Sequence, residues 1–193
     1  NPDGELRDAF QIVQGTYRTG PQEHLYSEPQ AVFATPEGTE SVTVYTSTQW
    51  PHHVQRSIAR VLDVPLKRVR VIATETGVHL DGKLWIPSLI SVHAALAALR
   101  TGRPVKLVYT RQEDFRFTSK RAPVRVRYTT ALDAAGDLRA VVVFIRVNVG
   151  AFPVYLEELL DRLVISATGD YRCDNIRVHA VALKTNQIGR ASC

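Results

Sequence analysis

Residues 77–83 read GVHLDGK and stand between a β-rich run and a helical run, an order of elements that shapes the fold around them. The run Val69 to Ala73 predicts a strand, and the run Pro87 to Arg100 predicts a helix. A strand, a glycine-punctuated loop and a helix, in that order, commonly present backbone N–H groups to an anionic ligand. The function therefore depends on which anion, if any, this loop holds.

The composition is typical of a globular protein. The chain has 193 residues, 45% of them hydrophobic and 22% charged, which suits one domain with a sizeable core. Its net charge of +5 is compatible with an anionic ligand but too weak to indicate nucleic acid. Cys173 and Cys193 alone provide neither a disulfide framework nor an iron–sulfur site. The apolar runs are short and no secretory signal is visible, so we expect a cytoplasmic protein that binds neither membranes nor nucleic acids.

The remaining pattern predicts an α+β fold with mixed or antiparallel sheets and packed helices, because hairpins and helices are interspersed irregularly. Turn sequences at residues 36–38 and 133–137 indicate two hairpins. The predicted strands cover residues 12–17, 31–34, 41–46, 69–73, 105–109, 124–131, 138–147 and 176–183. The predicted helices cover residues 53–62, 88–99 and 155–166.

Both ends of the sequence suggest truncation. The chain opens at Asn1 without a methionine, and its last residues, IGRASC, resemble a translated sequencing adapter. We therefore expect residues 1–187 to be an internal fragment of a longer enzyme and residues 188–193 to be an artefactual tail.

One alternative is a nucleotide-binding protein of the P-loop kind. Gly77, Gly82 and Lys83 nearly match the phosphate-binding loop of nucleotide hydrolases. In that loop the residue after the lysine is Ser or Thr, whose hydroxyl ligates magnesium, whereas this chain has Leu84. The six histidines form no i, i+4 pair and neither cysteine lies near another ligand, so no residue is predicted to bind a metal.

Five segments, in the right order, resemble the xanthine dehydrogenase and aldehyde oxidase family. The first contains EHLYSEP and resembles the family's EHxYLEP region, and the second, STQWP, resembles its STQ-P segment. The third contains TGRPVKL followed by TRQED, and the last two are NVGAF and KTN. The segments cover residues 15–29, 47–51, 94–114, 148–152 and 184–186.

The resemblance extends over residues 11–187 and implies the first molybdenum-cofactor-binding region of an oxidoreductase large subunit. It implies molybdopterin held next to a second molybdopterin-binding domain, with iron–sulfur clusters and FAD on other domains or subunits. Members hydroxylate a carbon of a small-molecule aldehyde or N-heterocycle with oxygen from water. The family's catalytic glutamate lies far downstream, so no residue of this chain is predicted to be catalytic and the fragment alone is expected to be inactive.

By position, the resemblance assigns cofactor contacts to Gln49, Gly77, Gly82 and Lys83. Gln49 corresponds to the amide that hydrogen-bonds the oxo group of the metal. The other three residues are what remains of a loop, Gly-Gly-Phe-Gly-Gly-Lys in most members, that approaches the cofactor through its backbone. Leu84 stands at a substrate-pocket position where purine-oxidising members have Glu, which disfavours a purine substrate.

The loop departs from the family pattern in its middle. Glycines permit positive φ and close backbone approach, and we expect the side chains of Val78 and Leu80 to obstruct both. Asp81 adds a negative charge beside an anionic pterin. A diverged, non-catalytic relative that serves as a binding or scaffolding module is therefore kept as a second hypothesis.

Overall fold

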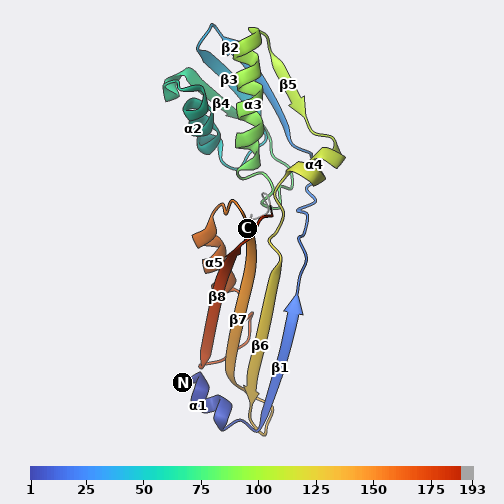
Figure 1. Ribbon diagram of the computed structural model, residues 1–193, viewed down its shortest axis with the longest axis vertical. Coiled ribbons are helices and arrows are strands. Elements are labelled where there is room, and N and C mark those ends of the chain that lie inside the picture. The colour runs from blue at the N-terminus through green and yellow to red at the C-terminus, as the bar shows by residue number, and fades with distance from the viewer. Residues whose placement is uncertain (188–193) are drawn as a thin grey trace. The chain divides into compact units, whose positions relative to one another are not determined.

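The computed structural model describes residues 1–187 and divides the chain into two compact units (Figure 1). Unit 1 joins Asn1–Gln22 to the chain from Lys120 onward, and unit 2 is Glu23–Ser119. Each unit contains its own four-stranded sheet. The predicted α+β class is confirmed, whereas the single core expected from the length is replaced by separate cores.

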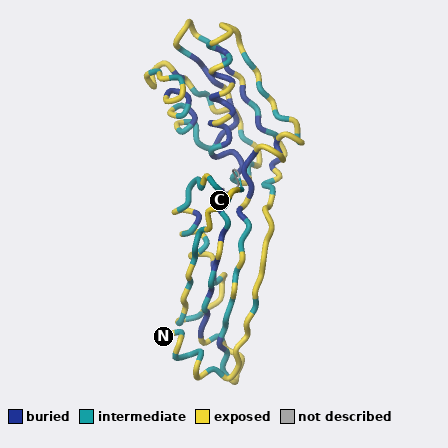
Figure 2. Tube along the Cα trace, in the orientation of Figure 1, coloured by how far each residue is buried: buried dark blue, intermediate teal, exposed yellow. Residues whose placement is uncertain are grey.

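Unit 2 is a mixed sheet with two helices packed against it. Its strand order is β4-β3-β2-β5, with β3 and β4 parallel and the other neighbours antiparallel. The strands are β2 (Ala31–Glu37), β3 (Ser41–Thr46), β4 (Val69–Ala73) and β5 (Val105–Val108). The main helices are α2 (Pro51–Leu62) and α3 (Ile86–Thr101). The core lies between these helices and the sheet, as the buried positions in Figure 2 show.

The two helices of unit 2 begin and end where their sequences permit. Pro51 and Pro87 stand in first turns, where a missing N–H costs no hydrogen bond. Asp63 and Gly102 end the helices in the left-handed conformation, with φ of 53° and 64°. Val54, Ile58, Val61 and Leu62 fall at helical spacing and predict one apolar stripe on the first helix. The stripe is confirmed at Val54 and Ile58, which are fully buried.

One member of that stripe was assigned wrongly. Val61 is 60% exposed, whereas Leu62, which was predicted for the same stripe, packs against the core. The apolar face therefore follows the i, i+4, i+8 spacing of a helix through to its last residue.

Unit 1 is a second mixed sheet with strand order β1-β6-β7-β8. Its first three strands are antiparallel, and β8 runs parallel to β7 after the crossover helix α5. The strands are β1 (Gln11–Arg18), β6 (Val124–Leu132), β7 (Leu138–Gly150) and β8 (Ile176–Lys184). Helix α5 (Leu156–Ile165) packs its leucines on one face of this sheet.

Short helical segments were not predicted. They are α1 (Pro2–Arg7), the 3-10 turn η1 (Leu66–Arg68) and α4 (Arg111–Phe117). Each is too short to show an apolar period, which is why the pattern of hydrophobic residues did not reveal it. The expected artefactual tail, residues 188–193, lies outside the described residues.

Within residues 1–187, no helix combines the length and the apolarity needed to cross a membrane.

Candidate functional site

The loop of residues 77–83 and Gln49 lie together beyond the ends of β4 and β3. Because these strands are parallel, their carboxyl ends share one edge of the sheet of unit 2. The backbone N–H of Gln49 donates to the carbonyl of Lys83 at 2.9 Å, and Gln49 Nε2 donates to Asp81 Oδ1 at 3.2 Å. The structure therefore brings the predicted amide and the predicted loop into direct contact.

Some hydrogen-bonding groups in this region have no partner among the described residues. Gln49 Oε1 is buried and has no hydrogen-bond partner among the described residues. The start of the loop, from Gly77 to Leu80, is mostly exposed, and no hydrogen bond described for residues 1–187 uses a backbone N–H from this segment. The exposed amide N–H groups can donate to acceptor oxygens of a ligand, and Gln49 Oε1 can accept from a donor group of the same ligand.

The middle of the loop adopts the conformation that glycine would favour. Leu80 has φ of 46° and Asp81 has φ of 61°, both in the left-handed region. The expectation that Leu80 would prevent positive φ is therefore wrong. The backbone keeps the glycine-like path, and the side chains bear a strain of about 1 kcal/mol each.

Leu80→Gly is expected to stabilise unit 2 by about 0.5 to 1 kcal/mol, because the relief of left-handed strain outweighs the added freedom of the unfolded chain. The matched control is Val78→Gly, at an exposed position of the same loop without positive φ, where glycine gives no such gain. Urea unfolding of both variants measures the difference. Equal destabilisation of the two would contradict the strain at Leu80.

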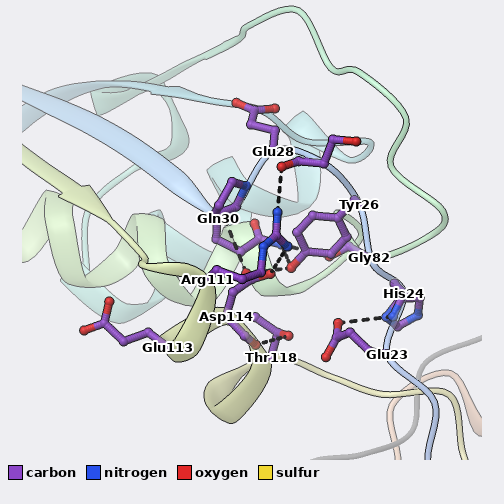
Figure 3. Close-up of polar contacts among 12 residues, drawn as sticks. Glu23, His24, Tyr26, Glu28, Gln30, Gly82, Arg111, Glu113, Asp114 and Thr118 are labelled. Carbon is purple, nitrogen blue, oxygen red and sulfur yellow. Dashed lines mark hydrogen bonds and ion pairs between the residues drawn. The ribbon is translucent and has the colours of Figure 1, made fainter.

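Gly82 is buried against the ring of Tyr26, as Figure 3 shows. A Cβ added at Gly82 would stand 2.1 Å from Tyr26 Cε1, whereas a Cβ added at Gly77 would meet nothing within 4 Å. The Tyr26 hydroxyl donates to Asp114 Oδ1 at 2.8 Å, and Gln30 Nε2 donates to the Gly82 carbonyl at 2.9 Å. Packing against Tyr26 is thus sufficient reason for glycine at position 82.

The ammonium of Lys83 is held inside unit 2. The side chain is 1% exposed, forms an ion pair with Glu28 at 2.9 Å and lies 5.5 Å from the centre of the Tyr26 ring. Its Nζ also donates to the carbonyl of Pro29 at 3.4 Å. A lysine of a phosphate-binding loop must reach the phosphates, so this arrangement argues against the P-loop alternative.

The segment that contains Tyr26 and Glu28 is anchored by a buried carboxylate. Asp114, in α4, is fully buried and accepts from Tyr26, from the backbone N–H of Gln30 and from Arg111 Nη1 at 3.2 Å. Burial raises the pKa of the Tyr26 hydroxyl, so that it remains a neutral donor. Arg111 also donates to the carbonyl of Ser27 at 2.6 Å.

The position of Asp114 depends on a cap that the sequence analysis missed. The Thr110 side chain accepts from the Glu113 backbone N–H, and the Glu113 carboxylate accepts from the Thr110 N–H at 2.7 Å. The hydrogen bonds that the Glu113 carboxylate accepts from the Thr110 N–H and then from the Thr110 hydroxyl lower the pKa of Glu113. The spacing of Thr110 and Glu113 is the signature of a capping box and is readable in the sequence.

Further observations limit the chemistry of this chain. Leu84, predicted to line a substrate pocket, is only 8% exposed. Ser88 Oγ lies 2.7 Å from His53 Nδ1, but Ser88 is itself buried and so is poorly placed as a nucleophile. Burial, followed by the charge of Arg56, lowers the pKa of His53. Among the described residues, no group of three or more His, Cys, Asp or Glu could hold a metal ion.

Comparisons with known proteins agree with this architecture. Aldehyde oxidase 2 of Cavia porcellus is 32% identical over 187 residues, which is 96% of this chain and 14% of that protein. A probable xanthine dehydrogenase subunit of Bacillus subtilis is 34% identical over 188 residues, which is 95% of this chain and 25% of that protein. The chain therefore spans a quarter or less of the length of these relatives.

The fold and the family are shown by two further matches. Aldehyde oxidoreductase of Desulfovibrio gigas matches 100% of this chain with 21% of its own, at a TM-score of 0.85 and 23% identity. A family model described as a molybdopterin cofactor-binding domain matches residues 1–192. The predicted resemblance is thereby confirmed, and the chain belongs to the family of molybdopterin cofactor-binding domains.

Proposed function

We propose that this chain is the part of a molybdenum hydroxylase large subunit that holds molybdopterin with Gln49 and the backbone of residues 77–80. The observation that supports this most is that exposed amide donors and a buried acceptor without a partner, Gln49 Oε1, lie at one edge of the sheet of unit 2, as a ligand with both acceptor and donor groups requires. When bound, the cofactor supplies the redox chemistry by which a substrate carbon is hydroxylated with oxygen from water.

In this proposal the residues of the chain act by donating and orienting. The backbone N–H groups from Gly77 to Leu80 donate to the anionic, oxygen-rich part of the cofactor. Gln49 Nε2 carries two hydrogens, of which Asp81 accepts one, and the second remains for the ligand. Lys83 and Gly82 act indirectly, because their contacts with Glu28 and Tyr26 fix the end of the loop.

The whole enzyme would include parts beyond this chain. We propose a small-molecule aldehyde or N-heterocycle as substrate, with Leu84 disfavouring purines, and a cytoplasmic location. We further propose a second molybdopterin-binding domain, together with iron–sulfur and FAD-containing domains or subunits. This chain spans only 14% and 25% of the lengths of two relatives, which supports an assembly of that kind.

A diverged, non-catalytic scaffold remains a second candidate because of Asp81. Its carboxylate accepts from the amide that would face the cofactor, and it brings a negative charge toward an anionic ligand. Of the two candidates, the cofactor-binding role is favoured by the glycine-like backbone path that Leu80 and Asp81 preserve.

Cofactor content separates the candidates. We expect the full-length protein, from a host that makes molybdopterin, to contain molybdenum by mass spectrometry and pterin by fluorescence after oxidative release. Gln49→Leu is expected to lower both about tenfold, the loss of roughly one hydrogen bond to a charged group, and Asp81→Asn to raise or preserve them. Gln112→Leu, at an exposed position of α4, is the control that should change neither. Wild-type protein free of molybdenum and pterin would favour the scaffold.

A further inference from the structure

The sheet of unit 1 has one covered face and one open, cationic face. Val126, Ile145 and Ala180 lie opposite one another on adjacent strands and belong to the core that includes Leu163 of α5. Because side chains alternate along a strand, the residues between them point to the other face. On that face, Arg18 pairs across the sheet with Arg125, which pairs in turn with Arg146.

An aromatic ring lies beside this row of arginines. In the next row, Thr16 pairs with Arg127 and Arg127 pairs with Phe144. The guanidinium carbons of Arg127 and Arg146 lie 6.0 and 5.2 Å from the centre of the Phe144 ring. Phe144 also stacks on His179, with 5.0 Å between the ring centres. Thr16, Phe144 and the arginines at positions 125, 127 and 146 line a shallow cavity of about 170 Å³.

No acidic side chain within the sheet balances the positive charge of this face. Strands β1, β6, β7 and β8 contain no Asp or Glu, and no ion pair described for residues 1–187 involves Arg18, Arg125, Arg127 or Arg146. Like charges directly opposite on a sheet are destabilising. The arginines near α1, by contrast, form ion pairs. Arg177 pairs with Asp3 at 2.7 Å, and Arg139 pairs with Glu5 at 3.3 Å.

We propose that the arginine face, defined as Arg18, Arg125, Arg127, Arg146 and Phe144, docks an acidic segment of another domain or subunit of the same enzyme. Carboxylates of that segment pair with the guanidinium groups, and one apolar side chain enters the hollow against Phe144. Arginine and aromatic residues dominate the energetics of protein interfaces. The proposal rests on the multi-domain enzyme proposed above, but it needs no cofactor to be bound.

Chemical footprinting tests the docking on the whole protein. Phenylglyoxal, which modifies accessible arginines, should label Arg125, Arg127 and Arg146 in the isolated 193-residue chain. In the full-length assembly these arginines should be protected at least tenfold, whether or not molybdenum is present, so the result is independent of the proposed function. Equal labelling in the two samples would overturn the proposal.

Charge reversal tests the chemistry of the partner. A synthetic peptide of alternating Glu and Leu, followed by fluorescence anisotropy, is expected to bind the chain and to lose at least tenfold in affinity with R125E/R146E. The control R103E/K106E changes the net charge equally at exposed positions of unit 2 and should leave most of the affinity. Undiminished binding to R125E/R146E would contradict the proposal, as would full displacement of the peptide by an equal concentration of pyrophosphate, which would indicate a small-anion site instead.

The single variant Arg125→Glu keeps this test independent of folding defects. It places a carboxylate between Arg18 and Arg146, and we expect the melting temperature of the isolated chain to rise. A fall in melting temperature would show that the arginines do not repel one another across the sheet, which removes the reason to seek an anionic partner.

Discussion

Gly82→Ala is expected to destabilise unit 2 by about 3 kcal/mol, because the new Cβ overpacks a site that cannot expand. The Cβ would lie 2.1 Å from Tyr26 Cε1. Tyr26 is 1% exposed and cannot withdraw without breaking its hydrogen bonds to Asp114 and Gln30. Both tryptophans, Trp50 and Trp85, belong to unit 2, so their fluorescence during urea unfolding reports on this unit alone.

The control for this experiment is Gly77→Ala in the same loop. Gly77 is exposed, its φ is not positive, and a Cβ there would meet no atom within 4 Å. We expect a change within about 0.5 kcal/mol, as for an ordinary surface substitution. Similar unfolding midpoints for the two variants would contradict the claim that Tyr26 is what requires glycine at position 82.

Asp114→Ala is expected to destabilise unit 2 by about 3 to 5 kcal/mol, because it leaves the donors around a buried carboxylate unpaired. Those donors are the Tyr26 hydroxyl, the Gln30 backbone N–H and the Arg111 guanidinium. Asp114→Asn keeps the shape of the side chain and part of its hydrogen bonding, so it should lose less stability than Asp114→Ala. Tryptophan fluorescence in urea again measures the effect.

Glu113→Ala is the matched control, since it removes a neighbouring carboxylate of α4 that is solvent-exposed and serves only the helix cap. It should cost clearly less stability than Asp114→Ala. If the two losses were equal, the effect at Asp114 would be a general loss of α4 rather than of the buried network.

The sequence predicted most of the regular structure of this chain. The long strands and the three longer helices follow from apolar periodicity and from Pro and Gly at their ends, as at Pro87 and Gly102. The division into two units was not predictable in the same way. It depends on residues 1–22 joining the chain from Lys120 onward, a pairing of β1 with β6 across about a hundred residues of chain.

The sequence marked residues that the structure brings together, Gln49 and the loop of residues 77–83, but not the contacts within this region. Resemblance to a family marked Gln49 and residues 77–83, but neither spacing nor composition indicates that Lys83 would pair with Glu28, 55 residues away. The same holds for Tyr26 against Gly82. Such contacts arise from tertiary packing, which local patterns do not encode. The capping box at Thr110 is the exception, because its signal is local.

The structure of the full-length protein loaded with molybdopterin is the strictest test of the proposed site. We expect the backbone N–H groups between Gly77 and Leu80, together with the Gln49 carboxamide, to lie within hydrogen-bond distance of the cofactor. Lys83 should still pair with Glu28 in that structure. A cofactor bound away from this loop, or held by a Lys83 ammonium released from Glu28, would contradict the proposed site.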